Sequence, residues 1–221
     1  MSLTTTSTLP VLYSFHRSSC SWRVRIGLNL KKIAYETRPV NLLTEENKTA
    51  EYKKIQPFGA VPAFVDSNTN GQVLIESLAI LDYLEESRPN EFPLLPKSPT
   101  DRAIVRALVQ AVAMDIQPVC SMRVLKYIGK DKEAEWATHF LSEGFAALEK
   151  MLVKTAGKYA FDDSITMADV FLMPQFYNGI RFGVDMTAYP VMSRVNAALE
   201  EVEEFRAAHP SRQPDCPPEM R

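Results

Sequence analysis

The chain has 221 residues, of which 46% are hydrophobic and 24% are charged, and its formal net charge is −2. This length allows one large or two modest domains with hydrophobic cores, and the composition is ordinary for a globular protein. The small net charge and the lack of a basic block argue against nucleic acid as a partner. No uninterrupted apolar run approaches the ~20 residues that a membrane span requires, so we expect no membrane association.

Cysteine usage predicts a reducing compartment. Cys20, Cys120 and Cys216 are widely spaced and odd in number, and they show neither a disulfide framework nor the spacing of a metal site. The three histidines are dispersed as well, so we predict no metal. Residues 1–8 are rich in Ser and Thr rather than apolar, unlike a secretory signal. We therefore expect a cytoplasmic protein.

From Leu9 to about Ser87 the sequence alternates between strand and helix patterns. The apolar run 10–13 predicts a strand, and residues 34–40 predict a second strand that is parallel to the first because a helix connects them. Residues 61–65 and 73–75 flank an Asn-Gly turn and predict a hairpin. A short helix is expected at 50–55, and an amphipathic helix after Ser77. The order βαβ followed by ββα predicts a compact mixed sheet.

The stretch from Arg88 to Pro99 contains four prolines and predicts an interdomain linker. Only helical patterns follow it. We expect helices over about 101–127, with a bend at Pro118, and over about 132–155, 167–182 and 189–208, and then an extended tail from His209. The predicted organisation is an α/β domain over residues 1–88, a linker over 89–99 and an all-α domain over 100–221.

Three small polar side chains, Ser18, Ser19 and Cys20, stand at the start of the first predicted helix. The first amide groups of a helix lack internal partners and carry partial positive charge, so an anion such as a thiolate is stabilised there. We expect Ser19 to donate a hydrogen bond to a sulfur, which belongs either to Cys20 or to a bound thiol. The ordinary alternative is that these serines only cap the helix.

Two further features extend this pattern. A cis peptide at Val61-Pro62 would turn the Val61 backbone outward to pair with a peptide-like ligand. At the next helix start, Ser77 could hold a carboxylate while Glu76 binds an ammonium group. Each feature alone is most often a rigid loop or a cap. Together they match glutathione, which has a thiol, peptide bonds, a carboxylate and an amine.

The stretch from Ser18 to Ile26 resembles the S-S-C-S-x-R-V-R-I signature of zeta-class glutathione transferases, the maleylacetoacetate isomerases. The similarity covers nearly the whole chain, through residues 56–62, 76–80, 166–169 and 209–214. This resemblance implies an α/β thioredoxin-like N-terminal domain (βαβ-ββα) followed by an all-α C-terminal domain. It also implies glutathione as the cofactor and a homodimer.

The resemblance assigns site residues by position. Ser18, Ser19 and Cys20 would line the glutathione sulfur, with Cys20 as its neighbour rather than the nucleophile. Arg181 would take a carboxylate of the substrate. The remaining glutathione contacts would be Lys48, in a loop that looks shorter than in relatives, Val61, Glu76 where the family often has Gln, Ser77, Gln117, and Ser121 in a stretch that departs from the family.

The activity that the resemblance implies is isomerisation of maleylacetoacetate to fumarylacetoacetate in tyrosine and phenylalanine catabolism, by reversible addition of the glutathione thiolate. One alternative is a general glutathione transferase or peroxidase that acts on α-haloacids or hydroperoxides. Another is a non-catalytic thioredoxin-fold adapter, which would predict a broken sulfur site. A disulfide oxidoreductase is disfavoured because the C-x-x-C pair is missing.

Two further pairs of residues, one charged and one capping, can be explained by structural roles alone. Arg23 and Arg25 could be solvated helix charges, although one of them could add positive potential for the thiol. Thr166 and Asp169 predict a variant capping box at the start of a buried helix. The latter pair should serve stability and not chemistry.

Overall fold

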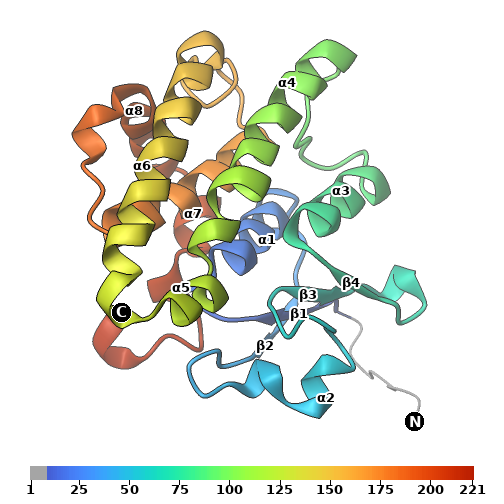
Figure 1. Cartoon of the computed structure of the whole chain (residues 1–221). Helices are drawn as coiled ribbons and strands as arrows, with labels where there is room; N and C mark the ends of the chain where they lie inside the picture. Colours follow the sequence, from blue (N-terminus) through green and yellow to red (C-terminus); the bar gives the residue numbers. More distant parts are fainter. Residues whose placement is uncertain (1–8) are drawn as a thin grey trace. The chain divides into compact units, whose positions relative to one another are not determined.

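The structure, a computed structural model, describes residues 9–221 and divides into two compact units (Figure 1). The described residues up to Phe92 and the segment Glu203–Arg221 form the first unit, and Pro93–Val202 forms the second. The segment from 203 onward therefore groups with the first unit, whereas we expected it to belong to the helical domain. The prediction about residues 1–8 lies outside the described residues.

The first unit is built on a sheet of four strands: β1 (Val11–Ser14), β2 (Glu36–Pro39), β3 (Ala63–Val65) and β4 (Val73–Ile75). Their spatial order is β2-β1-β3-β4. β1 pairs with β2 in parallel and with β3 antiparallel, and β4 is antiparallel to β3. The predicted βαβ-ββα arrangement is confirmed.

Helices cover both faces of this sheet. α1 (Ser19–Leu30) and α3 (Ser77–Ser87) pack against each other on one face, and α2 (Ala50–Lys53) lies on the opposite face (Figure 1). Leu12 of β1 and Ile80 of α3 are fully buried in this core. The connections contain the 3₁₀ turns η1 (Glu46–Lys48) and η2 (Ser67–Thr69).

The C-terminal segment, Glu203–Arg221, packs on α1. It contains α9 (Glu203–Ala207), η6 (Pro210–Arg212) and η7 (Pro218–Met220). Asn29 of α1 donates to the carbonyl of Glu204 at 3.0 Å. The predicted helix over 189–208 is therefore two helices, and the predicted extended tail is partly helical, because contacts with α1 organise the segment. Neither glycine nor proline marks the break at residues 201–202.

The second unit is helical. Its members are α4 (Pro99–Gln110), the π-helical η3 (Ala111–Ile116), η4 (Pro118–Cys120), α5 (Met122–Ile128), α6 (Lys130–Thr155), α7 (Met167–Arg181), η5 (Met186–Ala188) and α8 (Pro190–Glu200). The bend predicted at Pro118 is confirmed as a break between η3 and α5. Leu141, Phe145 and Phe171 are fully buried in the core of this unit.

Part of the proline-rich stretch predicted as a linker is packed. Leu94 and Leu95 are buried, and the carbonyl of Leu94 accepts a hydrogen bond from the amide of Met167 at 2.7 Å. Residues 93–99 therefore belong to the second unit. The prolines stop helix formation there, but the two leucines between them are buried.

The start of α7 carries the predicted capping box. The carboxylate of Asp169 accepts hydrogen bonds from the Thr166 amide at 2.8 Å, from the Thr166 hydroxyl at 3.2 Å and from the Ala160 amide at 2.8 Å. Burial raises the pKa of Asp169 to about 6, although these hydrogen bonds lower it. The capping box expected for this pair is confirmed.

Among the described residues, the helical stretch Pro99–Ile128 alone combines the length and mean hydropathy of a membrane-spanning helix. Core helices of globular proteins share these properties. Here the stretch is interrupted by η3 and Pro118 and carries Arg106 and Asp115. By itself it is a weak indication of a membrane span.

Candidate functional site

The register of the sheet brings the three predicted features of the first unit to one edge. Tyr13 near the end of β1 pairs with Ala63 at the start of β3, and Ala63 pairs with Ile75 at the end of β4. The chain leaves β1 toward the start of α1 at this edge. Val61-Pro62 enters β3 there, and Glu76-Ser77 leads from β4 into α3. Features far apart in the sequence are thereby neighbours.

The start of α1 holds the small polar side chains as predicted. Ser18 is the N-cap, and its Oγ accepts a hydrogen bond from the Ser21 amide at 3.1 Å. Ser19 and Cys20 form the first turn and are half-buried. Within residues 9–221, the Ser19 hydroxyl makes no hydrogen bond. It can therefore donate to a ligand atom placed at the positive end of the helix.

Arg23 is buried against this helix start. Its Nη1 lies 3.6 Å from the Cys20 sulfur and 3.3 Å from the Ser77 hydroxyl oxygen. Burial lowers the pKa of the Arg23 guanidinium, while the neighbouring Cys20 raises it. Arg23 is 2% exposed and Arg25 is fully buried, so the interpretation of both as solvated helix charges is wrong.

The spacing of Arg23 could have revealed its role. It follows Ser19 by four residues and Cys20 by three, so all three share one face of the helix. The sequence alone does not show that α3 covers that face. The contact with Ser77 appears only when the fold brings the starts of α1 and α3 together.

The peptide bond between Val61 and Pro62 is cis, as hypothesised from the sequence. Two side chains fix the backbone just before it. The Tyr52 hydroxyl donates to the Ala60 carbonyl at 2.7 Å, and the Gln56 side-chain oxygen accepts from the Ala60 amide at 3.1 Å. The Val61 side chain is buried in a cluster with Tyr52 and other apolar residues. The backbone of Val61 thus has a defined conformation at the edge of the site.

Glu76 and Ser77 have different environments. Glu76 is exposed and has a φ of 68°, a conformation that is costly for a residue other than glycine and that concentrates at functional sites. Ser77 is buried and begins α3. The carboxylate of Glu76 is therefore available to a cation beside a helix N-terminus that suits a carboxylate.

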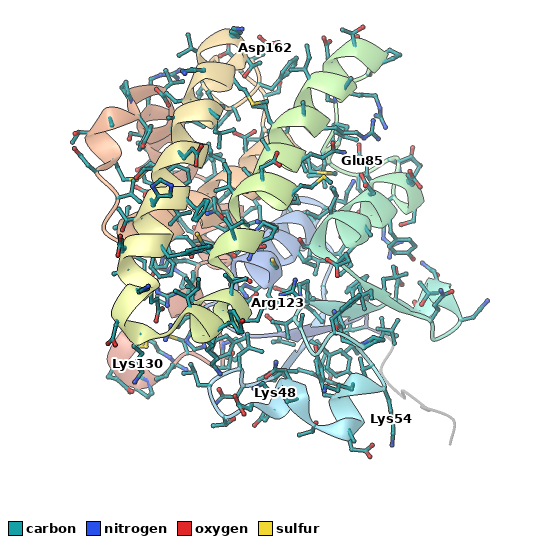
Figure 2. All side chains as sticks on the ribbon, viewed as in Figure 1. Lys48, Lys54, Glu85, Arg123, Lys130 and Asp162 are labelled. Atoms are coloured by element: carbon teal, nitrogen blue, oxygen red, sulfur yellow. The ribbon has the colours of Figure 1, made fainter. Side chains whose placement is uncertain are left out.

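Lys48 lies on η1 and is exposed (Figure 2). Its Nζ forms an ion pair with Glu45 Oε1 at 2.6 Å. The adjacent Asn47 side chain donates to the Gly59 carbonyl at 2.6 Å, which ties η1 to the loop that leads to Val61. The glutathione contact assigned to Lys48 stays a prediction.

The other predicted site residues lie in the second unit. Gln117 is half-buried between η3 and η4. Ser121 is the N-cap of α5, and its buried hydroxyl has no hydrogen-bond partner in the described part of the chain. Arg181 ends α7 and is exposed, with its guanidinium carbon 5.0 Å from the centre of the Phe182 ring. Their roles in ligand binding stay predictions.

The groups in the first unit fit glutathione. The start of α1 offers a hydroxyl donor, helix amides and a buried cation nearby, which suit a thiolate. The Val61 backbone suits a peptide, and the start of α3 with Glu76 suits a carboxylate next to an ammonium group. These groups are therefore complementary to the thiol, the central peptide and the γ-glutamyl end of the tripeptide.

Comparisons with protein families agree with this assignment. A family model described as "Glutathione S-transferase, N-terminal domain" matches residues 12–92. A second, described as "Glutathione S-transferase, C-terminal domain", matches residues 117–207. Together the two matches cover most of the chain.

Individual proteins are similar over almost their full length. The maleylacetoacetate isomerase of Rattus norvegicus is 49% identical over 216 residues, which are 96% of this chain and 97% of that protein. A crystal structure of the Anaeromyxobacter dehalogenans maleylacetoacetate isomerase, with bound dicarboxyethyl glutathione and citrate, is 40% identical with a TM-score of 0.86 and coverage of 97% and 96%. The holo structure of a bacterial zeta-class maleylpyruvate isomerase is 40% identical with a TM-score of 0.88 and coverage of 94% and 100%.

Proposed function

The chain belongs to the zeta class of glutathione S-transferases, which includes the maleylacetoacetate isomerases, and we propose that it isomerises maleylacetoacetate to fumarylacetoacetate with glutathione as cofactor. One observation carries this proposal. The sheet register gathers Ser18-Ser19-Cys20, Val61-Pro62 and Glu76-Ser77 at one edge.

The residues of the first unit would hold and activate the cofactor. Ser19 donates a hydrogen bond to the sulfur, and the α1 amides and buried Arg23 favour its ionised form. Glu76 and Ser77 hold the γ-glutamyl end, and the Val61 backbone pairs with the peptide. When bound, glutathione supplies a thiolate that adds reversibly to the cis double bond, permits rotation about the resulting single bond and leaves again.

In the second unit, Arg181 would bind a carboxylate of the substrate. A guanidinium matches a carboxylate with two parallel hydrogen bonds, and Arg181 is exposed at the end of α7. Such an interaction orients a diacid and offsets the negative charge that develops when a thiolate attacks it. The relative crystallised with dicarboxyethyl glutathione and citrate binds molecules of this charge type.

The chain would act as a homodimer in the cytoplasm. Ile104 of α4 and Met114 of η3 are exposed apolar side chains on one helical stretch, and they are the kind of surface that a second copy covers. A mass measurement by light scattering should give two chains. All three cysteines are free, as a reducing compartment requires.

A spectrophotometric assay of maleylacetoacetate turnover, with and without glutathione, tests the proposed function. We expect turnover only with glutathione, and no consumption of glutathione as the product accumulates. The same preparation should be offered an α-haloacid, with release of halide as the readout. Halide release without isomerisation would identify a general transferase instead.

A further inference from the structure

The loop between β1 and α1 determines where the sulfur site lies relative to the sheet. It runs from Ser14, the last residue of β1, to Ser18, the N-cap of α1. Within the loop, the Ser18 amide donates to the Phe15 carbonyl at 2.9 Å. A displacement of this loop would move Ser19 and Cys20 with it, because they form the first turn of the helix that the loop begins.

Arg25 holds the loop from the side of α1. Its Nη2 donates to the His16 carbonyl at 3.0 Å, and its Nη1 approaches the Phe15 carbonyl at 3.4 Å and the Ser14 hydroxyl at 3.2 Å. Its Nε donates to the carbonyl of Ala208 at 3.0 Å. One buried guanidinium therefore joins the loop to the C-terminal segment.

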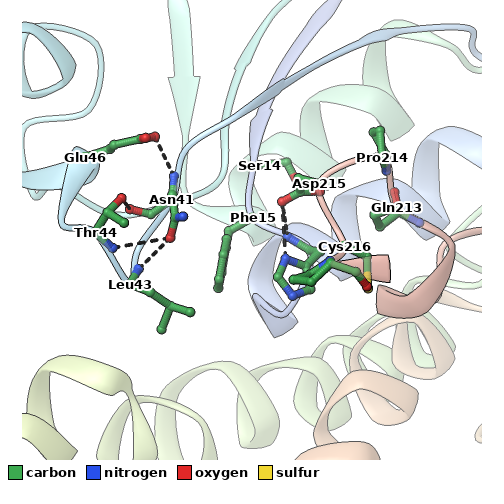
Figure 3. Close-up of polar contacts among 12 residues, drawn as sticks. Ser14, Phe15, Asn41, Leu43, Thr44, Glu46, Gln213, Pro214, Asp215 and Cys216 are labelled. Atoms are coloured by element: carbon green, nitrogen blue, oxygen red, sulfur yellow. Dashed lines mark hydrogen bonds and ion pairs between the residues drawn. The ribbon is translucent and has the colours of Figure 1, made fainter. Parts of the chain in front are cut away.

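Asp215 of the C-terminal segment holds the loop from a second side. Its Oδ2 accepts a hydrogen bond from the His16 amide at 2.8 Å and lies 3.4 Å from His16 Nδ1 (Figure 3). The Asp215 side chain is 11% exposed, and that of His16 is 3% exposed. Since β1 ends at Ser14, the sheet supplies no acceptor for this buried amide, and Asp215 does.

Other contacts orient the C-terminal segment before it reaches the loop. The Gln213 side chain donates to the carbonyls of Ala207 and His209, both at 3.0 Å. The His209 ring packs edge-on against Trp22 of α1, with 5.1 Å between the ring centres. Asp215 is therefore presented to the loop by a segment that is itself fixed on α1.

We propose that Asp215 is a positioning residue of the thiol site, which acts by fixing the His16 amide and with it the start of α1. This inference rests on the proposed function, because that function places the glutathione sulfur at the start of α1. It predicts that the C-terminal segment, which is remote from the sulfur site in sequence, sets the efficiency of thiol activation. Hydrogen-bond donors stabilise a developing charge only when they are held at the correct distance, so small displacements are costly.

The test compares the variants Asp215→Ala and Asp215→Asn with the wild type, at a temperature well below every melting temperature. The readouts are kcat, KM for glutathione, and the thiolate fraction of bound glutathione at neutral pH by ultraviolet difference absorbance. We expect Asp215→Ala to lower kcat roughly tenfold or more and to lower the thiolate fraction. KM should change by about threefold or less, because Val61, Glu76 and Ser77 still bind the peptide.

Asp215→Asn keeps an oxygen that can accept from the His16 amide, so it should restore most of the lost kcat. Glu203→Gln is the matched control. It disrupts ion pairs with Arg206 and Arg212 in the same segment but has no contact with the loop, and it should behave as wild type.

Three results would overturn the inference. Asp215→Ala could keep the wild-type kcat and thiolate fraction while only its melting temperature falls, which would indicate a purely structural role. Asp215→Asn could be as impaired as Asp215→Ala, which would indicate that charge and not hydrogen bonding matters. Glu203→Gln could be equally impaired. If the wild type itself neither binds nor uses glutathione, the proposed function fails instead, and the two failures are thus distinct.

Discussion

The guanidinium of Arg23 lies 3.3 Å from the hydroxyl of Ser77 and so connects the starts of α1 and α3. The nitrogen that makes this contact, Nη1, is also 3.6 Å from the Cys20 sulfur. A single buried cation thus contacts one residue of the predicted thiol site, Cys20, and one residue of the predicted γ-glutamyl site, Ser77. The thiolate and the γ-glutamyl carboxylate are both anions, so this cation favours both.

Replacing Arg23 should impair glutathione use more than it impairs folding. We expect Arg23→Met to lower kcat/KM for glutathione by roughly tenfold to a hundredfold, because the site loses its charge and the Ser77 hydroxyl loses its donor. Arg23→Lys keeps the charge but not the geometry of the guanidinium, so its kcat/KM should lie between those of the wild type and Arg23→Met. Steady-state kinetics at varied glutathione, with melting temperatures, provide the measurement.

Lys31 is the matched control for Arg23, since it is also a buried cation but is the C-cap of α1, at the opposite end of the helix. Its Nζ contacts Glu85 at 3.0 Å and the Phe92 carbonyl at 2.9 Å. Lys31→Met should cost about 3 kcal/mol of stability and leave kcat/KM unchanged. Equal kinetic losses in both variants would mean that Arg23 serves only the fold.

Glu76 should contribute to the binding of glutathione rather than to the chemical step. Glu76→Gln keeps an acceptor oxygen and matches the residue that the family often has there, so we expect KM for glutathione to rise by only about fivefold. Glu76→Ala should raise KM further while kcat stays near wild type, because Glu76 is assigned to the γ-glutamyl ammonium and not to the sulfur. A fall in kcat at saturating glutathione would contradict this assignment.

Asp169 makes the stability of the protein depend on pH. Its pKa is about 6 in the folded protein, above the ordinary value of 3.8, so the folded state binds more protons between these values. Its contribution is therefore fully present below pH 3.8 and is lost as the pH rises through 6. A shift of this size is worth on the order of 3 kcal/mol.

The comparison of wild type with Asp169→Asn isolates this effect. In urea unfolding measured across the window from pH 4 to 6, the wild type should lose stability relative to the variant as the pH rises. At acid pH the melting temperature of the variant should be lower than that of the wild type. A constant difference across the window would show that Asp169 titrates at its ordinary value.

Much of the fold could be predicted because local patterns and tertiary contacts agree in most elements. The four strands, the parallel pairing of β1 with β2 and the break at Pro118 follow from periodicity, connection type and proline chemistry. The thioredoxin-like domain followed by a helical domain is confirmed by the family matches and the fold. The break after Glu200 could not be predicted, because packing on α1 produces it without a local breaker residue.

The site was predictable where its residues form local motifs. Ser18 as N-cap, the cis bond before Pro62 and Ser77 at a helix start all follow from neighbouring residues. The burial of Arg23 and the contact between Asp215 and His16 could not be inferred, since each depends on an element distant in the sequence. The second contact joins residues 199 positions apart.

The most direct test of the central claim is the kcat of glutathione-dependent maleylacetoacetate isomerisation in Ser19→Ala and in Cys20→Ala. If Ser19 donates to the sulfur of bound glutathione, Ser19→Ala should lose about a hundredfold or more, as when an essential donor to a developing anion is removed. Cys20→Ala should retain kcat within about tenfold, because glutathione brings its own thiol. An active Ser19→Ala enzyme beside an inactive Cys20→Ala enzyme would contradict the account and make Cys20 the nucleophile.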